Sequence, residues 1–181
     1  FSLSYLPFIV AAVCEAIGKF PKVNAHVEGE NLVVFDHVNV AIAVDLDFEG
    51  LVVPVIKDAS KKNVSELSRT ISELANRAKA KTLTPEDYQG ATYTISNNGS
   101  FGTLFTTPII NQPQVAILST DAITNRPLAV EREGENHLVI RPVGILTQAF
   151  DHRAIDGAYA AAFLHRVKEI IETKDWDLTL V

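Results

Sequence analysis

The spacing of apolar side chains changes along this chain from the period of a helix to that of a strand, and this change limits the fold more than any other feature. Residues 3–20 place apolar side chains at intervals of three and four, which predicts a helix with one apolar face that stops at Pro21. Residues 38–46 alternate large apolar with smaller or polar side chains, which predicts a strand with one heavily buried face. Such a mixture is typical of an α/β chain.

The rest of the chain continues this mixture. Residues 51–56 form a uniformly apolar strand, and Pro54 inside it cannot donate a ladder hydrogen bond, so this segment is expected at an edge or a bulge. Asn63 followed by Glu66 is a capping-box pattern that predicts the start of a second helix. Further strands are predicted over residues 91–96, 114–120, 127–133 and 137–150, and a last helix over about 157–173. The sequence therefore predicts an α/β sandwich of helices on one largely mixed sheet.

Length and charge exclude several classes of protein. A chain of 181 residues is long enough for one domain with a substantial core and does not require two. The net charge of -6 argues against a nucleic-acid surface, and no apolar run approaches the roughly 20 residues of a membrane span. The single cysteine, Cys14, cannot form an intramolecular disulfide, and its place in an apolar helical pattern predicts inert core packing.

One of the five histidines stands apart from the others. His152 lies between a predicted buried strand and the last helix, in the stretch "QAFDHRAIDGAYAAAFL", with Asp156 four residues later. This arrangement fits a catalytic base; alternatively, Asp156 caps the helix and His152 is a loop residue, and the two readings of Asp156 are compatible. No metal site is expected, because the other histidines lack partners at metal-ligand spacing and are interpreted as structural or exposed. These are His26, His37, His137 and His165.

Four segments resemble a known family. "HRAIDG" fits the HxxxDG motif of the CoA-dependent acyltransferase superfamily, which includes chloramphenicol acetyltransferase. "VAIAVDLDFEGLVVPVI", "TYTISNNGSFGTLFTTPIINQPQVAIL" and "AFDHRAIDGAYAAAFL" resemble, in the expected order, segments of the dihydrolipoyl acyltransferase (E2) core of 2-oxo acid dehydrogenase complexes, and the opening "LPFIVAAVCEAIGKFPKVNAHVEG" is similar to that family too. The resemblance covers nearly the whole chain.

The resemblance implies a fold and an activity. The fold is a chloramphenicol-acetyltransferase-like two-layer sandwich, with residues 1–181 forming one E2 acyltransferase catalytic domain. The activity is the reversible transfer of an acyl group between the thiols of dihydrolipoamide and coenzyme A. A thiol with a pKa near 8.5 is only slightly ionised at neutral pH, so its attack on a thioester benefits from a base. By resemblance His152 is that base, and its neutral imidazole can take the proton.

The resemblance also gives roles to two other residues. Ser96 matches the family hydroxyl that donates to the tetrahedral oxyanion; on sequence alone, a strand-end hydroxyl bonded to backbone is the alternative. Asp156 is expected to hold the catalytic loop by pairing with a basic group and not to transfer a proton. Its usual partner in the superfamily is an early arginine, and residues 1–18 contain neither Arg nor Lys.

The glycine-bearing loop after Ser96 is a candidate for the wall of the channel in which the two thiols meet. Its glycines permit close approach of backbone to a ligand or a positive φ, and a purely structural turn explains them equally well. The candidate substrate and coenzyme A residues are Asn97, Gly99, Ser100, Phe101 and Gly102.

The resemblance further implies partners. Coenzyme A is a substrate, and the lipoyl group is carried on a domain absent from this chain, which also shows no peripheral-subunit-binding domain. Trimers with active sites between subunits are expected, with His152 of one chain meeting Ser96 of the next, and these build a larger cage. E1 and E3 components are expected to bind through segments outside the chain, in a bacterial or archaeal cytoplasm or a mitochondrial matrix.

Two points remain open in the sequence. The E2 core usually carries several tens of residues ahead of the first helix, and these are expected to be missing here. The motif "NNGSFG" favours an acetyl or branched-chain acyl group over succinyl.

There are two alternatives to an E2 enzyme. One is a non-catalytic E2-like structural core, against which the presence of both His152 and Ser96 argues, and the other is another CoA-dependent acyltransferase of the same superfamily.

Overall fold

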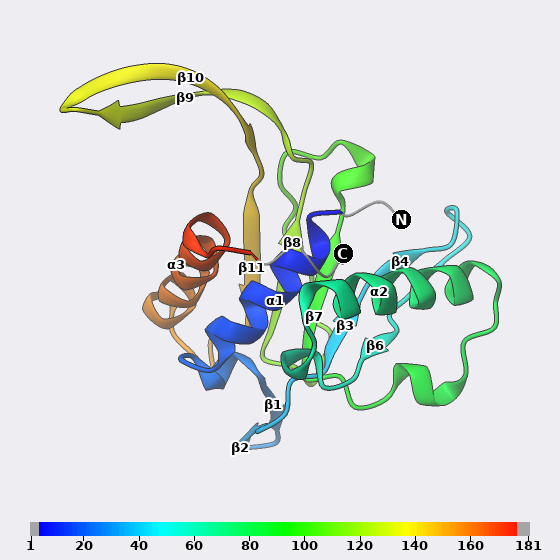
Figure 1. Cartoon of the computed structure of the whole chain (residues 1–181). Helices are drawn as coiled ribbons and strands as arrows, with labels where there is room; N and C mark the ends of the chain where they lie inside the picture. The colour runs from blue at the N-terminus through cyan, green and yellow to red at the C-terminus, as the bar shows by residue number, and fades with distance from the viewer. Residues whose placement is uncertain (1–3, 177–181) are drawn as a thin grey trace.

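The computed structural model describes residues 4–176, and a five-stranded mixed sheet lies at its centre (Figure 1). The strand order is β11-β8-β7-β3-β6; β8, β7 and β3 run parallel, and an antiparallel strand closes each edge. This confirms the predicted mixed sheet. The five strands are β3 Val40–Ile42, β6 Val55–Ile56, β7 Tyr93–Asn97, β8 Ala116–Thr120 and β11 Leu146–Phe150.

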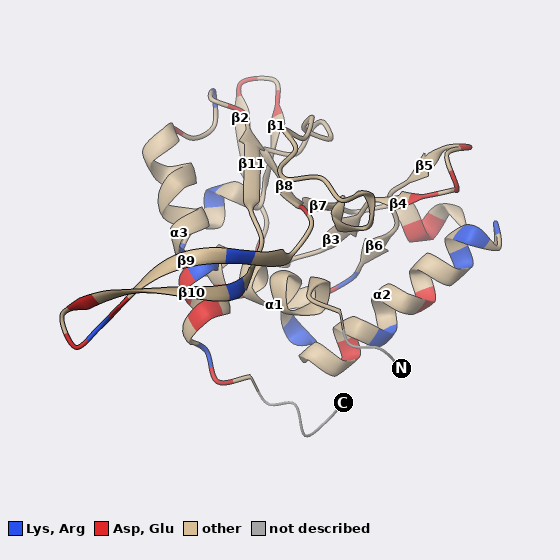
Figure 2. Cartoon of the chain, turned by 90° about the horizontal axis from the view of Figure 1, so that it is seen from above, with Lys and Arg blue, Asp and Glu red and all other residues tan. Residues whose placement is uncertain are grey.

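Three helices cover one side of this sheet, as Figures 1 and 2 show together. They are α1 Leu6–Ile17, α2 Val64–Lys79 and α3 Gly157–Thr173. α1 lies between the other two and contacts both. The core between helices and sheet is fully buried in places, with Val10, Leu67, Tyr93 and Phe163 all at 0% exposure. The predicted sandwich of helices on one sheet is therefore confirmed.

The first helix is shorter than its apolar pattern predicts. It ends at Ile17, and Phe20 lies beyond it, with its ring 5.3 Å from that of Tyr159 and 6.2 Å from that of Phe163. Phe20 continues the apolar pattern because it packs on α3 and not because it is helical. Leu3, which the pattern also includes, lies outside the described residues.

The strand predicted over residues 38–46 is wrong in two respects. It is interrupted at Ala43, after which the short strand β4 (Val44–Asp45) pairs with β5 (Leu51–Val52) outside the central sheet. Val40, Ala41 and Ile42 are all buried, so the strand has no solvent face. The reason is that both faces of the sheet are covered here: Val40 and Ile42 lie beside the buried Tyr93 and Ile95, and Ala41 lies on the other face beside Thr94, which bonds to the buried Gln114.

Two predictions that rest on single residues, a proline and a capping pair, are confirmed. Pro54 interrupts the segment 51–56, and β6 after it is an edge strand, as the proline predicts. The Asn63 side chain accepts from the Glu66 N–H at 2.8 Å, and the Glu66 carboxylate accepts from the Asn63 N–H at 2.8 Å. This reciprocal capping box starts α2 where the sequence predicts it.

The strand predicted over residues 137–150 is two strands. β10 (Glu135–Val143) pairs with β9 (Thr124–Arg132) in a long hairpin that leaves the body of the molecule, with charged residues at its tip (Figure 2). The chain then returns to the sheet as β11. Gly144 allows this change of direction, because a Cβ there would lie 2.8 Å from the Ile123 side chain.

The remaining elements are short. β1 (Ala25–Glu28) and β2 (Asn31–Val34) form a small hairpin, and single 3₁₀ turns occur at Pro21–Val23, Ala59–Lys61, Pro85–Tyr88 and Gly99–Phe101. None of the helices in the described part is long and apolar enough to cross a membrane.

Candidate functional site

Ser96 lies near the carboxyl end of β7. Its side chain is on the face of the sheet opposite that of Tyr93, which packs against Phe163 of α3. In the strand register Ser96 pairs with Ser119 of β8, and Ser119 pairs with Thr147 of β11. Because paired residues on neighbouring strands share a face, three hydroxyl side chains form a row across the sheet. Ser96 is half-buried, so its hydroxyl is held by neighbours and still accessible from outside.

The Asn98 amide connects these hydroxyls. Its Nδ2 lies 3.3 Å from Ser96 Oγ, 2.9 Å from Thr106 Oγ1 and 3.0 Å from Ser119 Oγ. Ser96 Oγ also lies 3.5 Å from Asn98 Oδ1, the outer limit of a hydrogen bond. The Ser96 hydroxyl is therefore held by a side-chain network and not, as the alternative from the sequence had it, by backbone.

The loop after Ser96 is a tight turn that also borders a pocket. Asn97 Oδ1 accepts from the Gly99 N–H at 3.2 Å, and Gly102 has a left-handed φ of 71° that disfavours residues with a Cβ. Asn97, Ser100 and Phe101 line a pocket of about 620 Å³, together with residues of β4 and α2. The two glycines thus shape the turn, and the other three candidate channel residues face a cavity.

His152 is exposed, on the turn between β11 and α3, with its ring 5.6 Å from that of Phe150. Its flanking residues bond to each other: Arg153 donates to the Asp151 carboxylate from Nε at 3.0 Å and from Nη2 at 2.6 Å. The hydrogen bond from Arg153 holds the pKa of the Asp151 carboxyl below its usual range. The ion pair of the loop therefore joins Asp151 to Arg153, and the His152 imidazole is exposed beside it.

Asp156 caps the last helix. Its Oδ1 accepts from the Tyr159 N–H at 2.8 Å, which confirms the capping interpretation. Within residues 4–176 it forms no ion pair with a lysine or arginine. The basic partner implied by the resemblance is thus not supplied by the described part of this chain.

Ser96 and His152 lie at opposite ends of the sheet. Ser96 is level with Ser119 of β8, whereas the Asp151 N–H next to His152 donates to the Val115 carbonyl at the other end of that strand. Four residues separate these two levels, about 13 Å along a strand, and β7 and β11 are two strand spacings apart, about 10 Å. One chain therefore does not bring the imidazole within hydrogen-bond reach of the serine hydroxyl.

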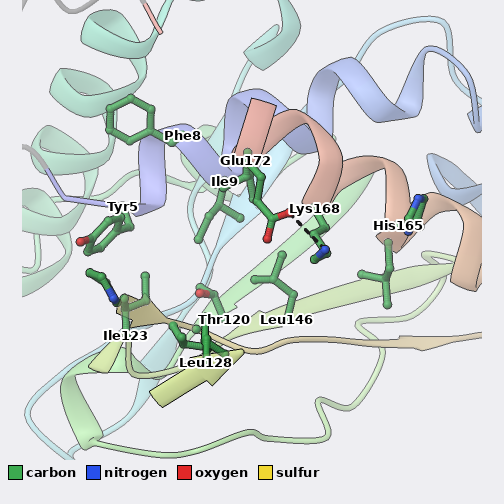
Figure 3. A pocket seen from close by; sticks show the side chains of 15 residues that line it. Tyr5, Phe8, Ile9, Thr120, Ile123, Leu128, Leu146, His165, Lys168 and Glu172 are labelled. Atoms are coloured by element: carbon green, nitrogen blue, oxygen red, sulfur yellow. Dashed lines mark ion pairs between the residues drawn. The ribbon is translucent and has the colours of Figure 1, made fainter. Parts of the chain in front are cut away.

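A second, mainly apolar pocket of about 470 Å³ lies elsewhere, between α1, α3 and the root of the β9–β10 hairpin (Figure 3). Tyr5 and Phe8 come from the start of the chain, Leu128 from the hairpin, and Lys168 pairs with Glu172 on α3 at 3.1 Å. None of the predicted catalytic residues lines this pocket.

Other candidate groups are structural. Burial raises the pKa of the Cys14 thiol to about 12, so Cys14 is not a nucleophile near neutral pH, as expected for core packing. His26 Nε2 hydrogen-bonds the Ala91 carbonyl at 2.9 Å, with its ring 4.6 Å from that of Phe35. Over residues 4–176, no three His, Cys, Asp or Glu side chains are grouped to hold a metal ion.

The sequence reasoning missed the residues that support Ser96. Asn98 lies in the quoted loop motif, but nothing in the sequence assigns its amide to Ser96. Ser119 reaches the site through the pairing of β7 with β8, and Thr106 reaches it from the segment between these strands, which contacts Asn98 and Ser119. The clustering of Ser, Thr and Asp in "ILSTDAIT" is the one available signal, and it becomes informative only once the strand register is known.

Comparison with known proteins gives a consistent result over the whole chain. The family of 2-oxoacid dehydrogenases acyltransferase (catalytic domain) matches residues 2–180. The chain is 41% identical over 170 residues to the dihydrolipoyllysine-residue succinyltransferase component of the 2-oxoglutarate dehydrogenase complex of Haemophilus influenzae, covering 94% of this chain and 40% of that protein. It is 40% identical over 178 residues to the dihydrolipoyllysine-residue acetyltransferase component of the pyruvate dehydrogenase complex of Corynebacterium glutamicum, covering 97% of this chain and 26% of that protein. The chain thus spans less than half of each relative.

Solved structures with the same fold include a probable dihydrolipoamide acetyltransferase of Listeria monocytogenes, with a TM-score of 0.90 and 35% identity over 99% of this chain and 74% of that one. The Azotobacter vinelandii dihydrolipoamide acetyltransferase, studied for the roles of a serine, a histidine and an asparagine in its catalytic mechanism, has a TM-score of 0.87 and 32% identity over 94% and 69%. The cubic core of a pyruvate dehydrogenase multienzyme complex has a TM-score of 0.88 and 33% identity over 95% and 70%.

A more distant structure supports the fold alone. Chloramphenicol acetyltransferase has a TM-score of 0.56 and 17% identity over 93% of this chain and 78% of that one. The predicted chloramphenicol-acetyltransferase-like sandwich is confirmed.

Proposed function

The chain belongs to the acyltransferase catalytic-domain family of the 2-oxoacid dehydrogenases, and on that premise we propose that it transfers an acyl group between the thiols of dihydrolipoamide and coenzyme A. The relatives in Haemophilus and Corynebacterium are named dihydrolipoyllysine-residue succinyl- and acetyltransferases. The observation that carries the proposal is the placement of two side chains at opposite ends of the sheet. One is the half-buried Ser96, whose hydroxyl contacts an amide, and the other is the exposed His152. Each half fits one role in thiol attack on a thioester.

The chemistry requires a base and a donor. The thiol sulfur of one substrate attacks the thioester carbonyl carbon of the other, a new C–S bond forms, and the His152 imidazole takes the thiol proton. The carbonyl oxygen becomes an oxyanion that accepts a hydrogen bond from the Ser96 hydroxyl. When the intermediate collapses, the original C–S bond breaks and the departing sulfur takes the proton from the imidazolium. Neither substrate is oxidised or reduced.

Asp156 acts in this proposal by positioning the His152 loop. Its cap fixes the first turn of α3, which follows the loop directly. In the Azotobacter protein the studied asparagine follows the studied histidine by four positions in that protein's numbering, the same spacing as from His152 to Asp156. Aspartate and asparagine can both accept a hydrogen bond from a backbone N–H at this position, so either residue can cap the helix.

A second copy of the chain completes the site in this proposal. The separation of Ser96 from His152 leaves each half without the other, and His152 of one subunit meeting Ser96 of the next in a trimer resolves this. Leu138 and Ile140, on the hairpin that leaves the body, are 79% and 67% exposed, which suits a self-association surface. The structural relative that forms a cubic core favours assembly of such trimers into a cage.

The substrates follow from the same proposal. Coenzyme A binds as a substrate, and the lipoyl group arrives on a domain that is not among these residues, with E1 and E3 components bound through other segments. Asn97, Ser100 and Phe101 are the proposed channel residues for one thiol arm; the pocket of about 620 Å³ that they line also borders α2 and does not include Ser96. The bacterial origin of the named relatives favours a bacterial cytoplasm over a mitochondrial matrix.

The relatives do not support the preference for an acetyl or branched-chain group over succinyl. Identity is 41% to a succinyltransferase component and 40% to an acetyltransferase component, which does not separate them. Parallel assays with acetyl-, isobutyryl- and succinyl-coenzyme A, each with dihydrolipoamide as acceptor, identify the acyl group by the donor with the highest kcat/KM.

The test of the proposed site is a mixing experiment with two inactive variants. His152→Ala and Ser96→Ala chains are purified separately, dissociated, mixed in equal amounts and reassembled. In a trimer with sites between subunits, a site is intact when its histidine comes from the Ser96→Ala chain and its serine from the His152→Ala chain. Random assembly then restores about a quarter of the wild-type rate.

Each variant reassembled alone is the control, with its size measured before the assay. Absence of recovery in mixed particles of trimer size or larger would contradict a site shared between chains. A wild-type chain that forms such particles without transferring any acyl group supports the alternative, a structural E2-like core.

A further inference from the structure

A buried carboxylate lies beneath the Ser96 network. Asp121 directly follows β8 and is 2% exposed. It accepts from Thr103 Oγ1 at 2.5 Å, from the Thr106 N–H at 3.1 Å and from Ser119 Oγ at 3.4 Å, and Thr106 Oγ1 lies 3.2 Å from its Oδ1. No lysine, arginine or histidine pairs with it within residues 4–176. Hydrogen bonds alone satisfy this buried carboxylate.

The carboxylate fixes the direction of the hydroxyl hydrogen bonds. An ionised carboxylate has only acceptor atoms, so a hydroxyl beside it must point its hydrogen at it. Thr106 Oγ1 and Ser119 Oγ lie 2.5 Å apart, and each carries one hydrogen. Whichever of the two donates to the other, the next hydrogen goes to Asp121. Both hydroxyls then face Asn98 with lone pairs only.

This fixed direction orients the Asn98 amide. The side of the amide that faces two lone-pair donors must be its NH₂, and Asn98 Nδ2 does lie 2.9 Å from Thr106 Oγ1 and 3.0 Å from Ser119 Oγ. The same nitrogen lies 3.3 Å from Ser96 Oγ, the longest of its three contacts, and since an NH₂ has only two hydrogens Ser96 accepts a shared hydrogen bond. Among the described residues, the one acceptor within reach of the Ser96 hydrogen is then Asn98 Oδ1 at 3.5 Å, the outer limit of a hydrogen bond, so a closer ligand oxygen can take that hydrogen. A flipped amide would turn its oxygen to Ser96 and bind that hydrogen instead.

We infer that Asp121 is a positioning residue which, through Thr106, Ser119 and Asn98, keeps the Ser96 hydroxyl oriented as a hydrogen-bond donor to the substrate. The inference rests on the proposed function, because it gives Ser96 the oxyanion role. It goes beyond that function by assigning an oriented relay to Asp121, Thr106, Ser119 and Asn98.

The same contacts also tie the loop to the sheet, so a purely structural role must be separated from positioning. Asp121→Asn keeps the shape of the side chain and replaces one acceptor by a donor, so the hydroxyl directions are no longer fixed. Initial rates are measured over a range of acyl-coenzyme A and dihydrolipoamide concentrations for this change, made once in the wild-type chain and once in Ser96→Ala. The expected result is an about tenfold lower kcat with KM unchanged in the wild-type background.

The Ser96→Ala background makes the test specific. If Asp121 acts through Ser96, adding Asp121→Asn to Ser96→Ala lowers kcat no further. An equal loss of kcat in both backgrounds would overturn the inference, because the effect would then not pass through the serine hydroxyl.

One pair of variants and one control guard against loss of folding. Thr106→Val removes the hydroxyl at nearly constant shape and is expected to lower kcat, whereas Thr106→Ser keeps the hydroxyl and restores it. Asp87 is the matched control, since it accepts from the Thr84 N–H at 2.7 Å and from Arg77 far from Ser96. Asp87→Asn is expected to lower the melting temperature and leave kcat unchanged.

The outcomes separate this inference from the proposed function. If the wild-type chain shows no His152-dependent transfer, the proposed function fails and the inference fails with it. If His152→Ala and Ser96→Ala strongly lower kcat while Asp121→Asn and Thr106→Val retain the wild-type kcat, the function holds and the inference alone is wrong.

Discussion

The two ends of the central sheet present their functional side chains in opposite ways. At the Ser96 end, a half-buried hydroxyl contacts an amide that is itself fixed by two other hydroxyls. At the His152 end, the imidazole stands on an exposed turn whose ion pair involves only its neighbours Asp151 and Arg153. In the proposed site, one chain therefore supplies an oriented oxyanion donor and an exposed base.

This difference follows from what each role requires. A donor to an oxyanion is effective when it is oriented before the charge develops, which a buried network achieves. A base that must meet a substrate bound on another subunit has to protrude from its own chain. The energetic consequence is that replacing Ser96 should affect both folding and catalysis, whereas replacing the exposed His152 imidazole should affect catalysis alone.

The largest expected effect is on turnover at the exposed end. His152→Ala should lower kcat by at least about 10², because general-base assistance contributes about 10²–10⁴. Its melting temperature should stay at the wild-type value, since the imidazole is exposed and its removal leaves no cavity in the core. Steady-state assays and thermal unfolding test both statements. His165→Ala, which replaces an exposed histidine on α3, is the matched control and should change neither; a near-normal rate in His152→Ala would exclude the base role.

Ser96→Ala should affect both turnover and stability, unlike His152→Ala. We expect kcat to fall by about 10²–10³ with little change in KM, since an oxyanion donor acts only in the transition state. Because the Asn98 amide loses an acceptor, the free energy of unfolding should also fall by about 1 kcal/mol. Chemical denaturation measures that loss, with Ser100→Ala on the exposed part of the loop as control. A rise in KM at constant kcat would argue for a binding role instead.

Local signals predicted the His152 end well. The cap at Asp156 and the start of α3 at Gly157 are readable because a capping residue and its helix are adjacent in the sequence. The capping box of Asn63 and Glu66 and the edge position after Pro54 are predictable for the same reason. Each depends on residues only a few positions apart.

The Ser96 end was predictable only in part. Its serine follows from a family motif, but Ser119 and Thr147 reach it through pairings between strands 23 and 28 residues apart, as the register shows (119 − 96 and 147 − 119). The period of a strand tells which side chains share a face and not which strand lies next to it. The break at Gly144 has the same origin, because it depends on packing against Ile123.

A smaller effect is expected where the His152 loop joins α3. Asp156→Ala removes the cap and should cost about 1 kcal/mol of stability, whereas Asp156→Asn should cost little because asparagine caps equally well. Denaturation of both variants measures the difference. If kcat falls in Asp156→Ala and is retained in Asp156→Asn, the cap positions His152; an equal loss in both would show that the negative charge itself is needed.

The smallest effect concerns the pH dependence of the same loop. Arg153 lowers the pKa of the Asp151 carboxyl in the folded chain, so the unfolded chain binds the proton more readily. The stabilisation is therefore complete above the ordinary aspartate value of about 3.9 and is lost as pH falls through the lower folded value. Unfolding of the wild type and of Asp151→Asn is compared between pH 7 and pH 3. The gap should be constant from pH 7 to about pH 5 and narrow below it; a gap that stays constant to pH 3 would mean that Arg153 does not hold the loop through this carboxylate.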